Sequence, residues 1–235
     1  MNPAPRWRAR LDTAIARQAT ARGSLPSAKF RRGWVLRMNR IVKDVRAESL
    51  FGLPVSMPLV LDVDGTLIAG DLLYKSFFSI LRRNPFVVFQ CAAWLLRGRA
   101  ALKRQLALRS RIDWDRLQLH QDVLALAIRE KTAGRTIVLA TAADAVLAGQ
   151  LASRLGFIDQ LFASDGQRNL KGSAKAQMLR GMFPDGFIYA GDSAADLKVW
   201  RHATGIVLVN VRQSVAAGAR ALGLPMLELS GRAGV

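Results

Sequence analysis

The stretch that decides the fold is an apolar run ending in two carboxylates and a glycine turn, Leu59-Val60-Leu61-Asp62-Val63-Asp64-Gly65-Thr66-Leu67. Apolar residues followed by a turn signal predict a buried strand that reaches the edge of a sheet. Because side chains alternate along a strand, Asp62 and Asp64 point to the same side and can reach one site at its tip. Carboxylates this close repel each other, and a bound cation or a raised pKa relieves the repulsion. The competing interpretation is a capped turn between strand and helix, because Asp and Gly also favour turns.

Downstream of this stretch, predicted strands alternate with predicted helices. We predict strands at residues 58–63, 136–140, 160–163, 187–190 and 206–209, and helices at 144–155, 173–182 and 194–202. Such alternation is typical of a parallel sheet with helices on its faces. The stretch from 71 to 130 has a helical pattern throughout and is too long for a plain crossover. The predicted fold class is therefore α/β: a Rossmann-like parallel sheet flanked by helices, with a helical subdomain inserted after the first strand.

Polar side chains recur at the ends of the other predicted strands. Thr141 follows the second strand, and Asp192 follows the fourth, with Asp196 one helical turn later. Lys175 falls in the first turn of a predicted helix, where a cation is mildly unfavourable with the helix dipole, which suggests a placement for function. Oxygen ligands of this kind suit Mg²⁺. A carboxylate can also act as a nucleophile towards phosphorus, with a second one transferring protons and a lysine stabilising the phosphoryl oxygens.

Four short motifs resemble, in order, those of the haloacid dehalogenase superfamily: Asp62-Val63-Asp64-Gly65-Thr66, then Thr141, then Lys175, then Gly191-Asp192-Ser193-Ala194-Ala195-Asp196. The resemblance covers residues 58 to 210 and includes a phosphoserine-phosphatase-like segment around Lys175, with Lys171 as a rival for the same role. It implies a Mg²⁺-dependent phosphomonoester hydrolase that acts through an aspartyl-phosphate, with the inserted helices as a cap over the site. Dehalogenases of the superfamily lack the second aspartate of the first motif, so Asp64 favours phosphate-ester hydrolysis. Ala195 stands where several relatives place Asn, which removes one possible polar ligand near the metal.

The resemblance also implies a role for each matching residue. The catalytic residues would be Asp62 as nucleophile, Asp64 as general acid and base, Thr141 as a phosphoryl-binding hydroxyl, and Lys175 as the cation that steadies the nucleophile and the phosphate. The Mg²⁺ ligands would be the carboxylates of Asp62, Asp192 and Asp196 and the backbone carbonyl of Asp64.

We predict three parts along the chain: a basic leader at 1–56, a core domain at 57–70 and 131–235, and the cap at 71–130. The leader carries twelve Lys and Arg residues against three acidic ones. Trp7, Leu11, Ile15 and Ala19 recur every four residues, which favours a short helix with one apolar face. A basic amphipathic helix on an anionic membrane, a solvated arm and a transit peptide remain alternatives for this part.

The charge balance of the chain predicts an anionic partner. The 235 residues contain 35 Lys and Arg against 17 Asp and Glu, a net charge of +18. Phosphorylated metabolites, lipid-linked phosphates and acidic lipid surfaces fit this charge, and no nucleic-acid motif is present, so we expect no specific nucleic acid. The lone Cys91 excludes a disulfide framework. The longest apolar run, residues 85–96, is shorter than the about 20 residues of a membrane span. We expect a cytoplasmic protein, peripheral at the inner membrane face if it binds lipid.

The cap region is unusually rich in aromatic and basic residues. The aromatic residues among them are Tyr74, Phe77, Phe78, Phe86, Phe89 and Trp94. Either these side chains bury themselves in a helix pair, or they form an apolar face flanked by arginines that suits a lipid or membrane interface. Segments 81–85, 94–103 and 169–172 resemble dehalogenase-superfamily domains fused to 4-hydroxybenzoate-type polyprenyltransferases. That resemblance implies a membrane prenyltransferase as a partner, and a non-catalytic or regulatory role beside it is one alternative function. A phosphotransferase or mutase with the same intermediate is another.

Overall fold

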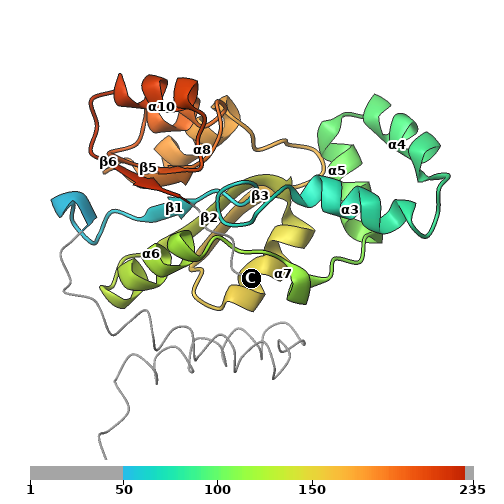
Figure 1. The fold of residues 1–235 in the computed structure, drawn as a ribbon. Coiled ribbons are helices and arrows are strands. Elements are labelled where there is room, and N and C mark those ends of the chain that lie inside the picture. The colour runs from blue at the N-terminus through green and yellow to red at the C-terminus, as the bar shows by residue number, and fades with distance from the viewer. Residues whose placement is uncertain (1–49, 231–235) are drawn as a thin grey trace, which may run out of the picture.

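A six-stranded parallel sheet forms the centre of the molecule (Figure 1). The computed structural model describes residues 50–230. The strands lie in the order β3-β2-β1-β4-β5-β6, and every neighbouring pair is parallel. Their bounds are β1 Leu59–Leu61, β2 Ile137–Asp144, β3 Gln160–Ser164, β4 Ile188–Gly191, β5 Gly205–Val209 and β6 Met226–Leu229. The predicted α/β fold class is confirmed.

Helices cover both faces of this sheet, and the alternation of side chains along β1 shows how. Leu59 and Leu61 belong to one apolar core, which contains most of the buried residues of α6 (Gln121–Thr132) and α7 (Ala145–Leu155). Val60 points the other way, into a second core with α8 (Ser173–Met182), α9 (Leu197–Trp200) and α10 (Gln213–Arg220). Because all three β1 residues are fully buried, this strand is apolar on both faces, as central parallel strands are.

Three of the helices that connect β1 to β2 along the chain lie at one end of the sheet (Figure 1). They are α3 (Leu72–Leu81), α4 (Val87–Leu96) and α5 (Arg99–Arg109). They share a small apolar core of their own around Ile80, Val87 and Leu106. The short 3-10 helix Trp114–Arg116 and then α6 follow, and the buried residues of α6 join the core beside the sheet. The predicted cap, 71–130, thus includes part of a helix that packs on the sheet, and the division of the chain into domains stays a prediction.

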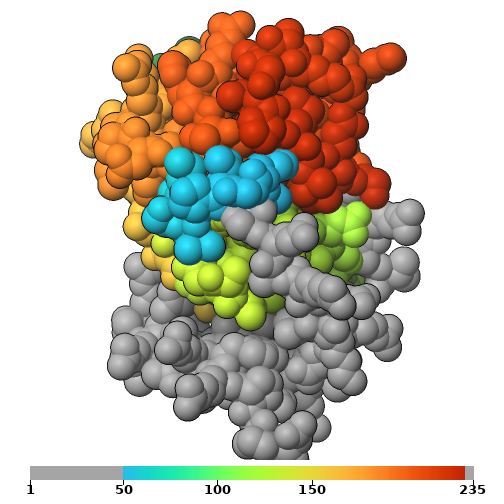
Figure 2. All heavy atoms as spheres, turned by 90° about the vertical axis from the view of Figure 1, so that its left-hand side faces the viewer, coloured from blue at the N-terminus to red at the C-terminus, as the bar shows by residue number. Residues whose placement is uncertain are grey.

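A buried arginine joins the segment before β1 to the rest of the core. Arg135 is fully buried, and its guanidinium donates to the backbone carbonyls of Leu53, Pro54 and Met57 and to the carboxylate of Glu130. Figure 2 shows the start of the described chain, in blue, lying across the surface between the C-terminal elements and the green helix region. The first strand is therefore held in place from its amino-terminal side.

The carboxyl ends of the parallel strands meet at one edge of the sheet, where ligands bind in open α/β folds. β1 ends one residue before Asp62, and β4 ends one residue before Asp192. In residues 50–230, no helix combines the length and the apolar character that crossing a membrane requires. The predicted helix around Trp7 and the rest of the leader up to residue 49 lie outside the described residues.

Candidate active site

Asp62 and Asp64 both line a cavity of about 590 Å³ at the carboxyl edge of the sheet. The Asp62 carboxylate accepts a hydrogen bond from the backbone N–H of Val63 at 2.7 Å. Its other oxygen, Oδ2, lies 2.9 Å from Nζ of Lys175. Asp64 accepts instead from the backbone N–H of Leu72 at 2.8 Å, at the start of α3. Asp62 is therefore held by Lys175 of α8, and Asp64 is held by the backbone at the start of α3.

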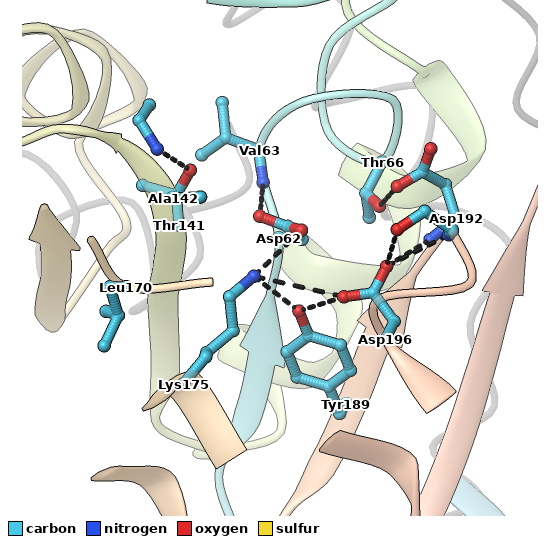
Figure 3. A network of polar contacts seen from close by, with 12 residues as sticks. Asp62, Val63, Thr66, Thr141, Ala142, Leu170, Lys175, Tyr189, Asp192 and Asp196 are labelled. Atoms are coloured by element: carbon cyan, nitrogen blue, oxygen red, sulfur yellow. Dashed lines mark hydrogen bonds and ion pairs between the residues drawn. The ribbon is translucent and has the colours of Figure 1, made fainter. Parts of the chain in front are cut away.

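Lys175, Tyr189 and Asp196 form a buried polar network behind Asp62 (Figure 3). The Lys175 ammonium donates to the Tyr189 hydroxyl at 2.8 Å, and that hydroxyl donates to Oδ1 of Asp196 at 2.8 Å. Lys175 also lies 4.0 Å from Asp196 Oδ1. One cation thus serves two carboxylates, because the tyrosine fixes its position between them. The sequence prediction missed Tyr189, although a phenol in an otherwise apolar buried strand was a possible signal.

The turn after β1 brings a second strand end against the first. Gly65 has φ +75°, and a Cβ at this position would lie 2.1 Å from Oδ2 of Asp192. The buried Thr66 hydroxyl donates to Oδ1 of the same aspartate at 3.4 Å. The imidazole of His120 is hydrogen-bonded to the Thr66 carbonyl at 2.8 Å and so stabilises the turn. Glycine is required here because only its missing side chain lets Asp192 approach.

Three carboxylates converge at this point. Asp62, Asp192 and Asp196 each offer one oxygen, and these oxygens lie within 4.8 Å of one another. Oδ2 of Asp196 accepts from the backbone N–H and the hydroxyl of Ser193, at 3.0 and 2.8 Å, and from the backbone N–H of Asp192 at 3.3 Å. Asp196 is thereby oriented by the loop that follows β4. An all-oxygen set of carboxylates is the donor chemistry that Mg²⁺ prefers, so the residues present fit this ion.

Burial and mutual repulsion raise the pKa values of Asp62, Asp64 and Asp192. Burial is the main cause for Asp62, whose pKa is raised although the Lys175 charge opposes the change. Burial and then the charge of Asp71 raise the pKa of Asp64 to about 7. Burial, followed by the charges of Asp196 and Asp62, raises the pKa of Asp192 to about 7. The cluster holds more negative charge than Lys175 can offset, which favours the binding of a cation.

The structure distinguishes the two lysines that the sequence left as rivals. Lys175 is buried and pairs with Asp62, whereas Lys171 is exposed and lines the same cavity. The ion pair with Asp62 therefore belongs to Lys175.

Thr141 is the predicted site residue whose place differs most from the expectation. It is fully buried, its hydroxyl accepts a hydrogen bond from the backbone N–H of Ala143 at 3.0 Å, and it does not line the cavity. The wall at this strand end is formed instead by Ala142, Ala143 and Asp144. The structure brings Asp62, Asp64, Lys175, Asp192 and Asp196 to one cavity, with Thr141 behind its wall.

The inserted helices add a cationic wall that the sequence prediction did not include. Lys103 of α5 donates to the Ala142 carbonyl at 2.6 Å and to Oδ1 of Asn169 at 2.8 Å. Burial lowers the pKa of this lysine, and the Lys171 charge lowers it further. Arg99 lines the cavity as well. Lys103 and Arg99 thus place two basic side chains on the cavity wall, which suits an anionic ligand.

Comparison with known proteins gives one sequence relative and many similar folds. No family profile matches the chain. The uncharacterised protein y4nM of Sinorhizobium fredii (strain NBRC 101917 / NGR234) is 37% identical over 199 residues. This match includes 84% of the present chain and 39% of the relative, so the chain spans well under half of the relative's length.

Among solved structures, a protein of unknown function from Bordetella pertussis Tohama I has a TM-score of 0.57 at 17% identity, covering 73% of this chain and 98% of that one. A phosphoserine phosphatase solved as an analogue of its phospho-aspartyl intermediate has a TM-score of 0.51 at 16% identity, covering 75% and 95%. The chain therefore has the α/β fold of phosphoserine phosphatases.

Proposed function

We propose that this chain is a Mg²⁺-dependent phosphomonoester hydrolase of the haloacid dehalogenase superfamily, acting on a lipid-linked or small phosphorylated metabolite. The observation that carries the proposal is the contact between Lys175 Nζ and Asp62 Oδ2 at 2.9 Å, within a cluster that also contains Asp192 and Asp196. The fold shared with phosphoserine phosphatases, one of them solved as a phospho-aspartyl analogue, supports the same chemistry.

In the proposed reaction Asp62 is the nucleophile. One of its oxygens attacks phosphorus, an Asp62 O–P bond forms, and the ester P–O bond breaks. The Lys175 ammonium offsets negative charge on the carboxylate and on the phosphoryl oxygens as the bond forms, and it needs no rearrangement because Tyr189 already holds it.

Asp64 is the proton carrier of this mechanism. With a pKa raised to about 7, its carboxyl group is protonated in a substantial fraction of molecules at neutral pH. It can give that proton to the leaving alcohol oxygen. The carboxylate so formed then takes a proton from water, whose oxygen attacks the aspartyl-phosphate and releases inorganic phosphate with Asp62 restored.

The metal would be held by the carboxylates of Asp62, Asp192 and Asp196 and by the backbone carbonyl of Asp64. When bound, Mg²⁺ supplies positive charge beside the carboxylates and the phosphoryl oxygens. The cationic wall of Lys103 and Arg99 would orient the rest of an anionic substrate and keep it from leaving.

Hydrolysis of an aryl phosphate by the full chain in Mg²⁺ tests the proposal. We expect Asp62→Asn to abolish turnover with the fold intact by circular dichroism, while Asp185→Asn, at an exposed turn, keeps full activity. Full turnover by Asp62→Asn would refute the proposal. Transfer of the phosphoryl group to an added alcohol in place of water would identify a phosphotransferase. The membrane prenyltransferase predicted as a partner stays a prediction.

A further inference from the structure

The inserted helices carry an apolar surface that the rest of the described chain leaves uncovered. Its members are large apolar side chains of α3, α4 and the loop between them, each between 50% and 91% exposed: Tyr74, Phe78, Phe86, Val88, Phe89, Leu95 and Leu96. We call this set the α3–α4 apolar surface. In residues 50–230, seven of the ten most exposed large apolar side chains belong to it. Such a concentration marks an interaction surface, whereas scattered exposed apolar residues do not.

The geometry of α4 explains why these side chains are left outside. Val87 faces inwards and is fully buried against the small core with Ile80 and Leu106. Phe86, just before α4, and Phe89 and Leu96 within it are spaced by three and seven residues, which places them together on the opposite side from Val87. The helix contains no charged residue between Val87 and Leu96. It is therefore apolar on its inner and its outer side, although only the inner side has a partner within residues 50–230.

The charges of the chain segment that carries this surface have one sign. From residue 72 to 112 the chain has no acidic residue and nine basic ones. Exposed arginines flank α4 at both ends, with Arg82 and Arg83 before it and Arg97 and Arg99 after it. None of these four pairs with a carboxylate of residues 50–230. A partner for the surface must therefore offer apolar contact at its centre and negative charge around it.

We propose that the α3–α4 apolar surface docks on an anionic lipid bilayer, with α4 lying in the plane of the headgroups. A bilayer provides acyl chains for Phe86, Phe89 and Leu96 and lipid phosphates for the flanking arginines. A helix of ten residues is about 15 Å long, half the apolar thickness of a bilayer, so α4 lies on the membrane and does not cross it. A second copy of the chain is disfavoured as the occupant, because two basic segments without acidic residues would then face and repel each other.

The docking surface adjoins the cavity. Tyr74 and Leu95 belong to the surface and also line the cavity, as does the flanking Arg99. A bilayer on this surface would therefore lie beside the cavity mouth. Lipid docking does not require the proposed hydrolysis, because it follows only from the exposure of the apolar side chains and the charge of the basic residues that flank them.

A fluorophore at position 89 tests the proposal directly. Cys91 is the single cysteine, so Cys91→Ala with Phe89→Cys gives one site for an environment-sensitive label, and Cys91→Ala with Met182→Cys gives a matched control on α8, where Met182 is 51% exposed. We expect the label at 89 to shift to the blue on vesicles of mixed phosphatidylcholine and phosphatidylglycerol, with no shift on phosphatidylcholine alone. The label at 182 should stay unchanged on both.

Sedimentation with the same vesicles gives a second measurement. We expect the pair Phe89→Glu and Leu96→Glu to lower the vesicle partition coefficient more than about tenfold, and Met182→Glu to leave it unchanged. The basic leader can hold the chain on vesicles by charge alone, so the label decides which part docks. A chain that sediments with vesicles while the label at 89 stays in water would overturn the proposal. So would a blue shift at 89 that grows with protein concentration and needs no vesicles, because it would identify a second copy as the occupant.

Discussion

Replacing Lys175 by methionine removes the cation that lies near both the partly buried Asp62 and the buried Asp196. The side chain is almost the same length but carries no charge, so Asp62 loses a partner at 2.9 Å and Asp196 one at 4.0 Å. At an effective dielectric of about 20, an ion pair at 2.9 Å is worth about 6 kcal/mol before the cost of burying the lysine is subtracted. Removing one partner of a buried pair typically costs about 3–5 kcal/mol, because the other charge is left unpaired. For a chain of 235 residues this corresponds to a fall in Tm of roughly 6–20 °C.

This loss should depend on pH, and the sign follows from Asp62. Burial already raises the pKa of Asp62, and the Lys175 charge holds it down, so the variant will have a still higher pKa. A carboxyl whose folded-state pKa lies above the unfolded value contributes stability at low pH and loses it as the pH rises through the folded value. We therefore expect Lys175→Met to cost more at pH 8 than at pH 5.

Urea unfolding in metal-free buffer at both pH values measures the loss of stability, and aryl-phosphate hydrolysis measures the loss of activity, which we expect to exceed about 100-fold. Lys171→Met is the matched control, since Lys171 lines the same cavity without the ion pair. Equal stability of Lys175→Met and the wild type at pH 8, or a larger activity loss in Lys171→Met, would show that Lys175 does not have this role.

Three other predictions concern contacts at the site and in the core. Gly65→Ala should lower the free energy of unfolding by about 1–2 kcal/mol through its positive φ, and lower activity more than tenfold through its clash with Asp192. Gly223→Ala is the control, because Gly223 has φ +67° and no atom within 4 Å of an added Cβ. In urea unfolding and aryl-phosphate assays it should show the stability loss alone. Arg135→Met should lower the free energy of unfolding by about 3–5 kcal/mol while activity per folded molecule is unchanged, and equal urea midpoints would contradict this. Mg²⁺ should raise Tm more at pH 8 than at pH 5, because the pKa of Asp192 is about 7 and protons compete with the ion below it; a larger rise at pH 5 would reverse this account.

Much of the fold was predictable because its determinants are local in sequence. The helix predicted at 173–182 is α8, Ser173–Met182, and the predicted strands at 58–63, 136–140, 160–163, 187–190 and 206–209 correspond to β1 to β5. The convergence of Asp62 and Asp192 was predictable as well, since parallel strands place their carboxyl ends at one edge. Helix α9 is shorter than predicted, because Ser193 to Asp196 form a turn in which Asp196 binds back to the backbone.

Other features depend on contacts between distant segments, which no local pattern reveals. The burial of Arg135 depends on three carbonyls about 80 residues earlier in the chain. Lys103 reaches the cavity only because α5 packs over the edge of β2. Helix α10 and strand β6 were not predicted; β6 is an edge strand with no fully buried residue, so its apolar pattern is short and weak.

In the proposed mechanism, Asp62 carries the phosphoryl group during the reaction. Rapid acid quenching of the full chain during turnover of an aryl phosphate, followed by mass spectrometry of its peptides, tests this most directly. We expect a phosphoryl group on the peptide that contains Asp62, more of it in Asp64→Asn, and none in Asp62→Asn. Turnover with no phosphorylated peptide in Asp64→Asn, or with the phosphoryl group on another residue, would contradict it.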